Sequence, residues 1–322
     1  MTAFEWKAPR LTVATLLVLA LTAVSVDAQR ISPRLTAAAG ASAVIDVTGH
    51  FAYSAGTRND SSGYRATSGL VLNADSSGWL ATSGPAVAAA GRMSPSTAAF
   101  APDATTRIAA TFALTKEGQY DGLRDTSVLR ALVDSSMAPQ LASMQDFPKQ
   151  VRDGYIAAAS IAALSARVEH AWWQLSGAFL SRSWSPGDSL STPYTEINAN
   201  MPGANIPLVY TLRYIGTVPC PTAQAGRRCW HFSAHTDMDM DGMRRAMTTL
   251  MTQMGTTDDA LIAQIPIPQS SIVYSLFYDA STSRIVDATM NTTIESKGST
   301  ALKVAASTAH VDVHLQYRWS ER

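Results

Sequence analysis

The segment His310–Trp319 reads HVDVHLQYRW, and its pattern predicts the fold class of this chain. Apolar and polar residues alternate at every position, which is the period of a strand with one buried face and one wet face. The side chains predicted to point inward are Val311, Val313, Leu315, Tyr317 and Trp319, and those predicted to point to water are His310, Asp312, His314, Gln316 and Arg318. Such a strand is typical of an antiparallel sheet that is solvated on one side.

Similar alternating or β-rich segments, separated by turn residues, recur through the chain and predict about ten strands. A turn is expected at 59–63, and 86–91 is ambiguous because it is rich in alanine. The predicted strands are 43–51, 64–73, 78–83, 105–114, 171–183, 208–215, 230–241, 271–279, 284–295 and 300–319.

Helical spacing of apolar residues predicts helices at 125–144, with an interruption at Pro139, at 154–168 and at 243–254. Strands and helices do not alternate along the chain, which excludes a doubly wound α/β fold. We therefore predict an α+β fold, in which a curved antiparallel sheet or half-barrel carries two to three helices packed on one face.

The N-terminus has the layout of a secretory signal peptide. Lys7 and Arg10 precede the apolar run Leu11–Val26, and cleavage is expected after Ala28. The alternative is an uncleaved anchor, for which this run is short against the roughly 20 residues of a membrane span. We expect an exported chain, periplasmic or extracellular, with no transmembrane span after cleavage.

The remaining chain divides into a flexible lead-in, 29–42, and one domain, 43–322. Two coupled halves, 43–168 and 169–322, are the alternative division.

Composition excludes some functions and predicts one covalent link. The chain has 25 basic and 25 acidic side chains, so it lacks the basic excess of a nucleic-acid binder. Its only cysteines, Cys220 and Cys229, flank a loop between two predicted strands. In an exported protein this spacing predicts a structural disulfide, whereas a redox pair usually has CxxC spacing.

A series of methionines runs from a predicted strand into a predicted helix. Methionine lines adaptable apolar pockets, so the series is a candidate wall of a ligand groove, with ordinary core packing as the alternative. The groove candidates are Met238, Met240, Met247, Leu250, Met251 and Met254.

Histidines and aspartates suggest a metal site less directly. Two histidines four residues apart on a strand are separated by about 13 Å, too far to chelate one ion. A site would need residues from two strands, and the candidates are His235, Asp237, His310 and His314. Asp237-x-Asp239-x-Asp241-Gly242 also matches the opening of a calcium loop, but Thr248 occupies the position where that loop needs glutamate.

Motifs for covalent or cofactor chemistry are missing from the sequence. It contains no G-x-S-x-G, S-x-x-K, H-E-x-x-H, phosphate-binding loop or dinucleotide fingerprint. We therefore predict no cofactor and a non-catalytic role, with a metal-dependent hydrolase kept as an alternative. Trp172 and Trp173, placed on a strand, would point to opposite faces, and one of them could contact a partner or a lipid.

Residues 170–319 resemble known groups of exported bacterial proteins. The motif Trp184–Asp188 (WSPGD) and the segment Tyr278–Ala288 (YDASTSRIVDA), followed by long alternating strands, are similar to an uncharacterised secreted family. The wider pattern resembles half-barrel periplasmic domains of the LolA and LppX kind, which bind lipids or lipoproteins. This resemblance implies a carrier with an apolar concave face under a helical lid. The lipobox cysteine that such families often carry is absent here.

The leading hypothesis is an exported soluble protein that binds an apolar or amphiphilic ligand, such as a lipid. The alternative is an envelope interaction or structural protein that has an envelope protein as its partner and no ligand pocket.

Overall fold

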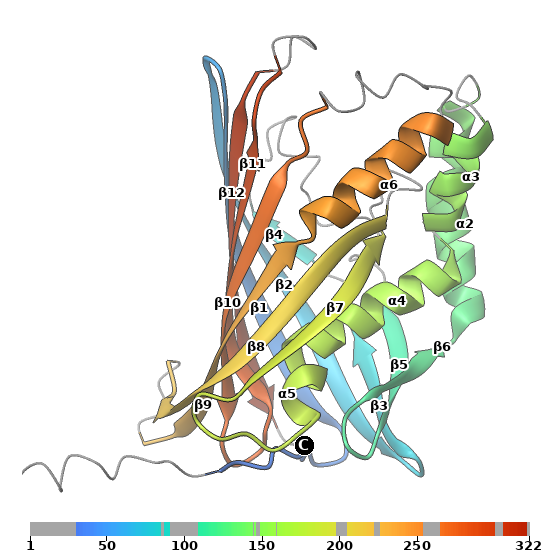
Figure 1. The fold of residues 1–322 in the computed structure, drawn as a ribbon. Helices are drawn as coiled ribbons and strands as arrows, with labels where there is room; N and C mark the ends of the chain where they lie inside the picture. The colour runs from blue at the N-terminus through green and yellow to red at the C-terminus, as the bar shows by residue number, and fades with distance from the viewer. Residues whose placement is uncertain are drawn as a thin grey trace, which may run out of the picture.

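The computed structural model describes residues 30–84, 87–90, 109–143, 145, 149–158, 160–197, 205–221, 226–253, 265–299 and 305–320. One antiparallel sheet contains all 12 strands found in these ranges (Figure 1). The strands are β1 (Ala41–Ala55), β2 (Arg58–Asp75), β3 (Gly78–Ser83), β4 (Val87–Ala90), β5 (Ala110–Thr115), β6 (Tyr120–Arg124), β7 (Ser189–Ile197), β8 (Asn205–Pro219), β9 (Arg228–Met238), β10 (Gln269–Asp279), β11 (Ile285–Ser296) and β12 (Ser307–Ser320).

The strand order brings the two ends of the chain together at the centre of the sheet. The order is β6-β5-β3-β2-β1-β12-β11-β10-β9-β8-β7, and β4 pairs with β2 beside this path. Strand β12 pairs with β1 from Ser42 opposite Ser320 to Ala55 opposite Ser307. The two strand-rich parts of the sequence are thereby joined in a single open sheet whose edges are β6 and β7.

In the described ranges, six helical segments accompany the sheet (Figure 1). The fold is therefore α+β with a curved antiparallel sheet, as the sequence predicts. The helical segments are α2 (Thr126–Ser143), α3 (Lys149–Ala158), α4 (Ile161–Trp172), the π-helix η3 (Trp173–Gly177), α5 (Ala178–Leu180) and α6 (Met240–Gln253). In the described ranges, none of these helices is long and apolar enough to cross a membrane.

The expected strand at 171–183 is wrong, because this segment continues α4 through η3 into α5. Trp172, Leu175 and Phe179 are spaced by three and four residues, which is a helical stripe that packs on the sheet. Their aromatic character favoured a strand, but burial against the sheet outweighs this propensity. Trp172 and Trp173 are therefore successive helical residues and do not lie on opposite faces of a strand.

Two other helix expectations need correction. Helix α2 runs without a break through Pro139, because proline removes one backbone donor and bends a helix without necessarily ending it. The helix expected at 154–168 is two helices, since α3 ends at Ala158 and α4 begins at Ile161. The Ser160 hydroxyl caps α4 by accepting a hydrogen bond from the amide of Ala163.

Strand boundaries also differ at several places. The turn expected at 59–63 lies at Gly56 and Thr57, because Gly56 adopts the left-handed backbone conformation and β2 already begins at Arg58. Strands β6 and β7 were not predicted. Within the expected strands 105–114 and 300–319, residues 105–108 and 300–304 lie outside the described residues.

One hydrophobic core joins the sheet to the segment α4–η3–α5. Phe179 stacks on Tyr278 with ring centroids 3.8 Å apart and meets Phe232 edge to face at 5.2 Å. Trp184, which directly follows this segment, is fully buried against Phe232. The helical segment thus fills the lower part of the curved sheet in the view of Figure 1.

Covalent and backbone links fix the lower end. Cys220 and Cys229 form the predicted disulfide between β8 and β9. The sequence places residues 31–36 in a flexible lead-in, but in the structure they are hydrogen-bonded to the domain. Ile31 exchanges two backbone hydrogen bonds with Trp184, and the amide of Thr36 donates to the carbonyl of Thr282. Ile31 and Leu35 are buried in the core.

Candidate functional site

The candidate site is on the concave face of the central strands, above the part of the sheet that the helical segment covers in the view of Figure 1. In register, Val47 lies opposite Leu315, and Met290 lies opposite Val313, so apolar side chains meet across neighbouring strands. We call this set the concave strip. Its members are Val47 of β1, Val311, Val313 and Leu315 of β12, Met290 and Ile294 of β11, and Ile272 of β10.

Charge is separated between the two faces of these strands. Every charged residue and every histidine of β1, β11 and β12 lies in the alternate register, on the convex face. Strand β10 carries no charge before Asp279, its last residue. The convex set is Asp46, His50, Asp287, Glu295, His310, Asp312, His314 and Arg318. The concave strip therefore offers an uncharged surface that favours apolar groups.

The concave strip is less buried than the core below it. All seven of its side chains are half-buried, whereas core residues such as Leu276 and Tyr278 are fully buried. Val47, Val311, Val313 and Ile294 are not members of the hydrophobic core clusters or of the partly buried shell around them. The partial exposure leaves apolar surface that further burial would stabilise by about 25 cal/mol per Å².

The π-helix η3, in the middle of the helical segment, forms the floor of this site, and tyrosines fix it in place. The hydroxyl of Tyr210 donates to the carbonyl of Gln174 at 2.9 Å, and that of Tyr278 donates to the carbonyl of Leu175 at 2.8 Å. Both acceptors belong to the π-helix η3, whose altered turn often marks functional sites. The floor is therefore held from two strands of the sheet.

Two buried polar atoms at this floor lack hydrogen-bond partners in the described part of the chain: Nε2 of His170 and Oγ1 of Thr236. The ring of His170 lies 3.9 Å from that of Tyr194 and 6.4 Å from that of Trp173. Desolvation lowers the pKa of His170 to about 4, so its imidazole is neutral at pH 7. Sequence reasoning missed both residues. His170 lies between the predicted helix 154–168 and the predicted strand 171–183, and its neighbour Tyr194 belongs to β7, which was not predicted.

The predicted methionine groove is described only in part. Met238 and Met240 line a surface hollow of about 350 Å³ at the ends of β9, β10 and β11, together with polar residues such as Ser271 and Glu295. Met247 and Met251 are half-buried on α6. The Leu250 side chain and all of Met254 lie outside the described residues. Six of the eight residues that line this hollow are polar or charged, so it is a poorer site for an apolar chain than the concave strip.

The four predicted metal-site residues do not meet at one point. His235 and Asp237 are close, with Nε2 and Oδ2 3.4 Å apart, but β10 and β11 separate their strand from β12. Three strand spacings place His310 and His314 about 14 Å away. These two histidines instead contact β11, where Nε2 of His314 lies 2.9 Å from Oδ2 of Asp287 and Nδ1 of His310 lies 3.2 Å from Oγ1 of Thr293. Within the described ranges, no group of three potential ligands can hold a metal ion.

The calcium-like string at Asp237–Gly242 has a structural explanation. A carboxylate oxygen of Asp239 accepts the amide hydrogen of Gly242 at 3.0 Å, and its carbonyl accepts the amide hydrogen of Met243. Asp239 therefore caps the start of α6, and Asp241 in the first turn suits the helix dipole. The spacing of the acids reflects the end of a strand followed by a helix cap.

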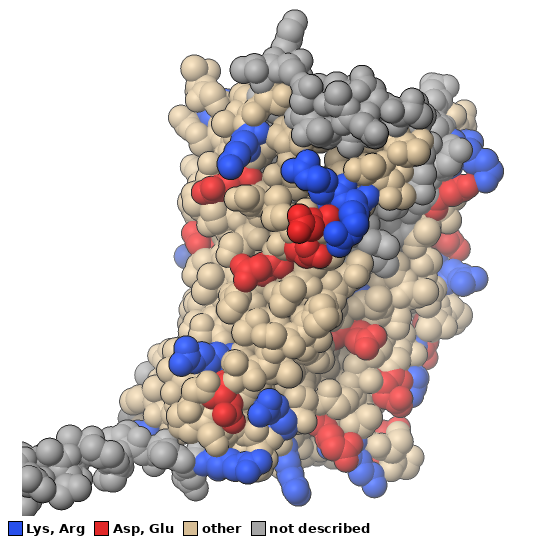
Figure 2. Space-filling model, viewed as in Figure 1, with Lys and Arg blue, Asp and Glu red and all other residues tan. Residues whose placement is uncertain are grey.

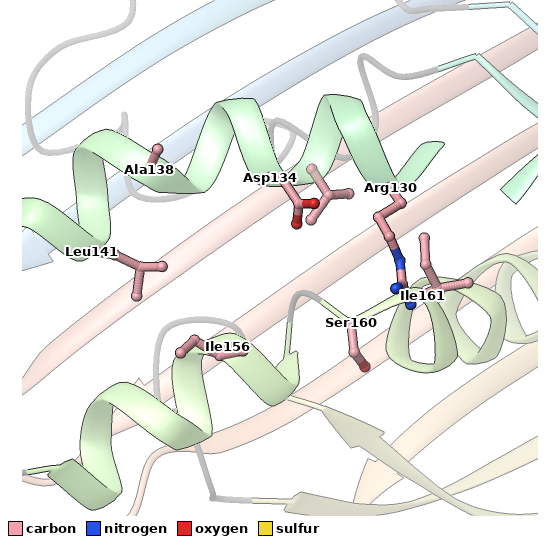
Figure 3. Close-up of a pocket in the computed structure, with 8 residues that line it drawn as sticks. Arg130, Asp134, Ala138, Leu141, Ile156, Ser160 and Ile161 are labelled. Atoms are coloured by element: carbon pink, nitrogen blue, oxygen red, sulfur yellow. The ribbon is translucent and has the colours of Figure 1, made fainter. Parts of the chain in front are cut away.

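A second cavity of about 410 Å³ lies between α2 and the helices α3 and α4 (Figure 3). Val133, Leu141 and Ile161 give it an apolar wall, while Arg130 points toward Ile161 and Asp134 points into the gap. Ile156 is 50% exposed at its edge. Nothing in the sequence pattern singled out this cleft, because its two walls come from helices that were expected to cover the sheet.

The comparisons with known proteins identify no family for this chain. No family model matches the sequence, and no curated protein matches it. One similar solved structure, titled "Lipid-protein interactions in lipovitellin", aligns with 87% of this chain and 25% of its own chain, at a TM-score of 0.38 and 8% identity. The present chain thus spans about a quarter of that protein's length. The resemblance to LolA and LppX stays a prediction.

Proposed function

We propose that this chain is an exported protein that binds an apolar or amphiphilic ligand, such as a lipid acyl chain, on the concave strip. The observation that carries this proposal is the strict separation of charge: the convex face of β1, β11 and β12 holds all of their charged residues and histidines, and their concave face holds none. A sheet face in contact with water could carry charged side chains. A face that binds an apolar molecule is expected to lack them.

The dimensions of the concave strip suit a chain-like ligand. It crosses four neighbouring strands, β1, β12, β11 and β10, which gives a width of about 14 Å. From Leu315 to Val311 it extends about 13 Å along β12. Each methylene group buried there contributes about 0.8 kcal/mol, so a medium-length acyl chain gains enough to bind without any charged contact.

Export is supported by two features of the chain. The Cys220–Cys229 disulfide is typical of an oxidising compartment. The apolar run Leu11–Val26 behind Lys7 and Arg10 favours secretion. A ligand of low water solubility would need a carrier in such a compartment.

Extraction of the purified protein with organic solvent, followed by mass spectrometry, tests the proposal. We expect a lipid or other apolar molecule to co-purify, and a fluorescent fatty acid to bind the emptied protein. Val47→Asp places a carboxylate in the concave strip and should lower fatty-acid affinity at least tenfold.

Val44→Asp is the matched control, since Val44 lies on the same strand but on the convex face, where it is 43% exposed. The control should bind as the wild type does. An emptied wild type that binds no fatty acid, or equal losses in the two folded variants, would contradict the proposal and favour the envelope structural role. Among the four candidate residues of the hydrolase alternative, only His235 and Asp237 contact each other, so this alternative is not favoured.

A further inference from the structure

Arginines gather at the lower end of the sheet, although the chain as a whole is neutral. The segments 30–40, 181–188, 226–229 and 279–284 hold six arginines and two aspartates, whereas the full chain has 25 basic and 25 acidic residues. Five of these arginines are exposed, and only Arg284 is buried. We call the exposed set the arginine rim; it consists of Arg30, Arg34, Arg182, Arg227 and Arg228.

Contacts between the four segments show that the arginine rim is one surface. Oγ of Ser32 and Oγ of Ser183 lie 2.7 Å apart, which joins the N-terminal segment to the loop that carries Arg182. The amide of Arg34 donates to the hydroxyl of Ser283 at 3.1 Å. The amide of Ala280 donates to the carbonyl of Arg228 at 3.0 Å. Residues 31–36 thereby contact both the loop 181–184 and the turn 279–284. The turn 279–284 also contacts the β8–β9 hairpin.

Two arginines of the rim lie near carboxylates of the same segments. Arg227 pairs with the buried carboxylate of Asp279 at 3.2 Å, and Arg182 lies 3.9 Å from Asp188. The five exposed arginines outnumber the two carboxylates of these segments, Asp188 and Asp279, by three. Figure 2 shows blue side chains along the lower edge of the molecule, with red ones among them.

We propose that the arginine rim docks this protein on a membrane surface that contains anionic phospholipids. Arginine matches phosphate oxygens with paired hydrogen bonds, and a negatively charged leaflet attracts each nearby basic side chain. The position of the rim in the chain supports a bilayer over an acidic protein. Arg30 follows the apolar run Leu11–Val26 by four residues, so the segment that enters or crosses a membrane during export leads directly into the rim. Cleavage after Ala28 would add the positive α-amino group of Gln29 at the same place.

This docking surface is separate from the concave strip, so it goes beyond the proposed ligand binding. The strip lies on strands beyond the helical segment, and the rim lies at the opposite end of that segment. A protein that docks through one end can remain on a membrane whether or not the strip is occupied. The two proposals can therefore fail independently.

Co-sedimentation with lipid vesicles tests the arginine rim. The full chain, expressed with its N-terminal segment and characterised for cleavage, is mixed with vesicles of phosphatidylcholine alone or of equal parts phosphatidylcholine and phosphatidylglycerol. We expect binding to the anionic vesicles only, and loss of binding as salt rises. A retained apolar anchor would insert into both kinds of vesicle, so the difference between them isolates the contribution of charge.

A charge-removal variant and a matched control complete the test. Each arginine near an anionic surface adds roughly a fivefold gain in affinity, so removing three should weaken binding about a hundredfold. The control removes three exposed basic residues away from the rim and should bind as the wild type does. The rim variant is Arg30→Gln, Arg34→Gln and Arg182→Gln, and the control is Arg58→Gln, Arg244→Gln and Lys297→Gln.

Thermal unfolding of each protein confirms that its fold is intact. Equal binding of the wild type to neutral and anionic vesicles, absence of binding to both, or equal losses in the rim variant and the control would each overturn the proposal. Absence of vesicle binding together with fatty-acid binding would leave the ligand-binding proposal standing alone.

Discussion

The indole Nε1 of Trp184 donates a hydrogen bond to the carbonyl oxygen of Phe179 at 2.8 Å, and both side chains are completely buried. Phe179 lies in the last helical turn, α5, and Trp184 links to the N-terminal residues through its two backbone hydrogen bonds with Ile31. Trp184 therefore connects the helical segment to the lead-in, and its ring also packs on Phe232 of the sheet.

Trp184→Phe should destabilise the protein by about 2–4 kcal/mol, because it removes the donor from a buried carbonyl and leaves a cavity. Urea unfolding followed by circular dichroism measures the change. The same substitution at Trp79, which is half-buried, serves as the control and should cost clearly less. Equal losses at the two positions would show that Trp184 has no special role.

Alkaline pH should loosen the floor of the candidate site. Burial raises the pKa values of Tyr210 and Tyr278 well above the ordinary value of 10, with neighbouring tyrosines as a smaller cause. The folded state holds these protons more tightly than the unfolded state, so their contribution to stability is complete below pH 10 and is lost as pH rises further.

Tyr278→Phe tests this prediction. The variant should lose about 1–2 kcal/mol at pH 7, because the carbonyl of Leu175 loses its donor, but its stability should fall less steeply above pH 10. Urea midpoints at several pH values, with tyrosinate absorbance as a second signal, measure both effects. Parallel pH curves for the variant and the wild type would contradict it.

The long central strands can be predicted from the local sequence pattern. The alternation of Val311, Val313 and Leu315 predicts both a strand and its inward face, since each residue has a fixed side on a half-buried sheet. Strand β7 escaped prediction because it is an edge strand with Pro193 and several serines and threonines, so it needs little apolar patterning.

The site is less predictable than the fold, because its parts come from distant segments. The inward face of β12 follows from sequence, but its union with β1 depends on a pairing between residues more than 250 positions apart. The π-helix that forms the floor is specified by tyrosines of β8 and β10, which no local pattern connects to Gln174 or Leu175. The separation of the metal candidates likewise depends on strand order, which spacing along the chain does not reveal.

Removal of the disulfide should destabilise the lower end of the sheet. Cys220 and Cys229 are nine positions apart, and closing such a loop stabilises a protein by about 2.5–3 kcal/mol in the chain-entropy model. The double variant Cys220→Ser, Cys229→Ser should show this loss in urea unfolding under oxidising conditions. Under reducing conditions the wild type should approach the stability of the variant, and a persistent difference would point to the buried Cys229 position itself.

Acid should destabilise the protein partly through His170. Desolvation depresses the pKa of this imidazole to about 4, whereas an unfolded histidine titrates near 6.5. The unfolded state therefore binds the proton first, so the contribution of His170 to stability is complete above about pH 6.5 and is lost as pH falls toward 4. Partial solvent exposure reduces the effect to about 1–2 kcal/mol.

His170→Phe isolates this contribution, because it keeps an aromatic ring beside Tyr194 and Trp173 but cannot bind a proton. We expect the stability of the wild type to fall more steeply than that of the variant between pH 7 and about pH 4. Urea midpoints measured at each pH give the difference in stability between the two proteins. The contributions of the carboxylates, which both proteins share, cancel in this difference. His50→Phe on the exposed convex face is the control and should follow the wild type. If the curves of wild type and His170→Phe coincide, the imidazole is not held neutral by burial at the floor of the site.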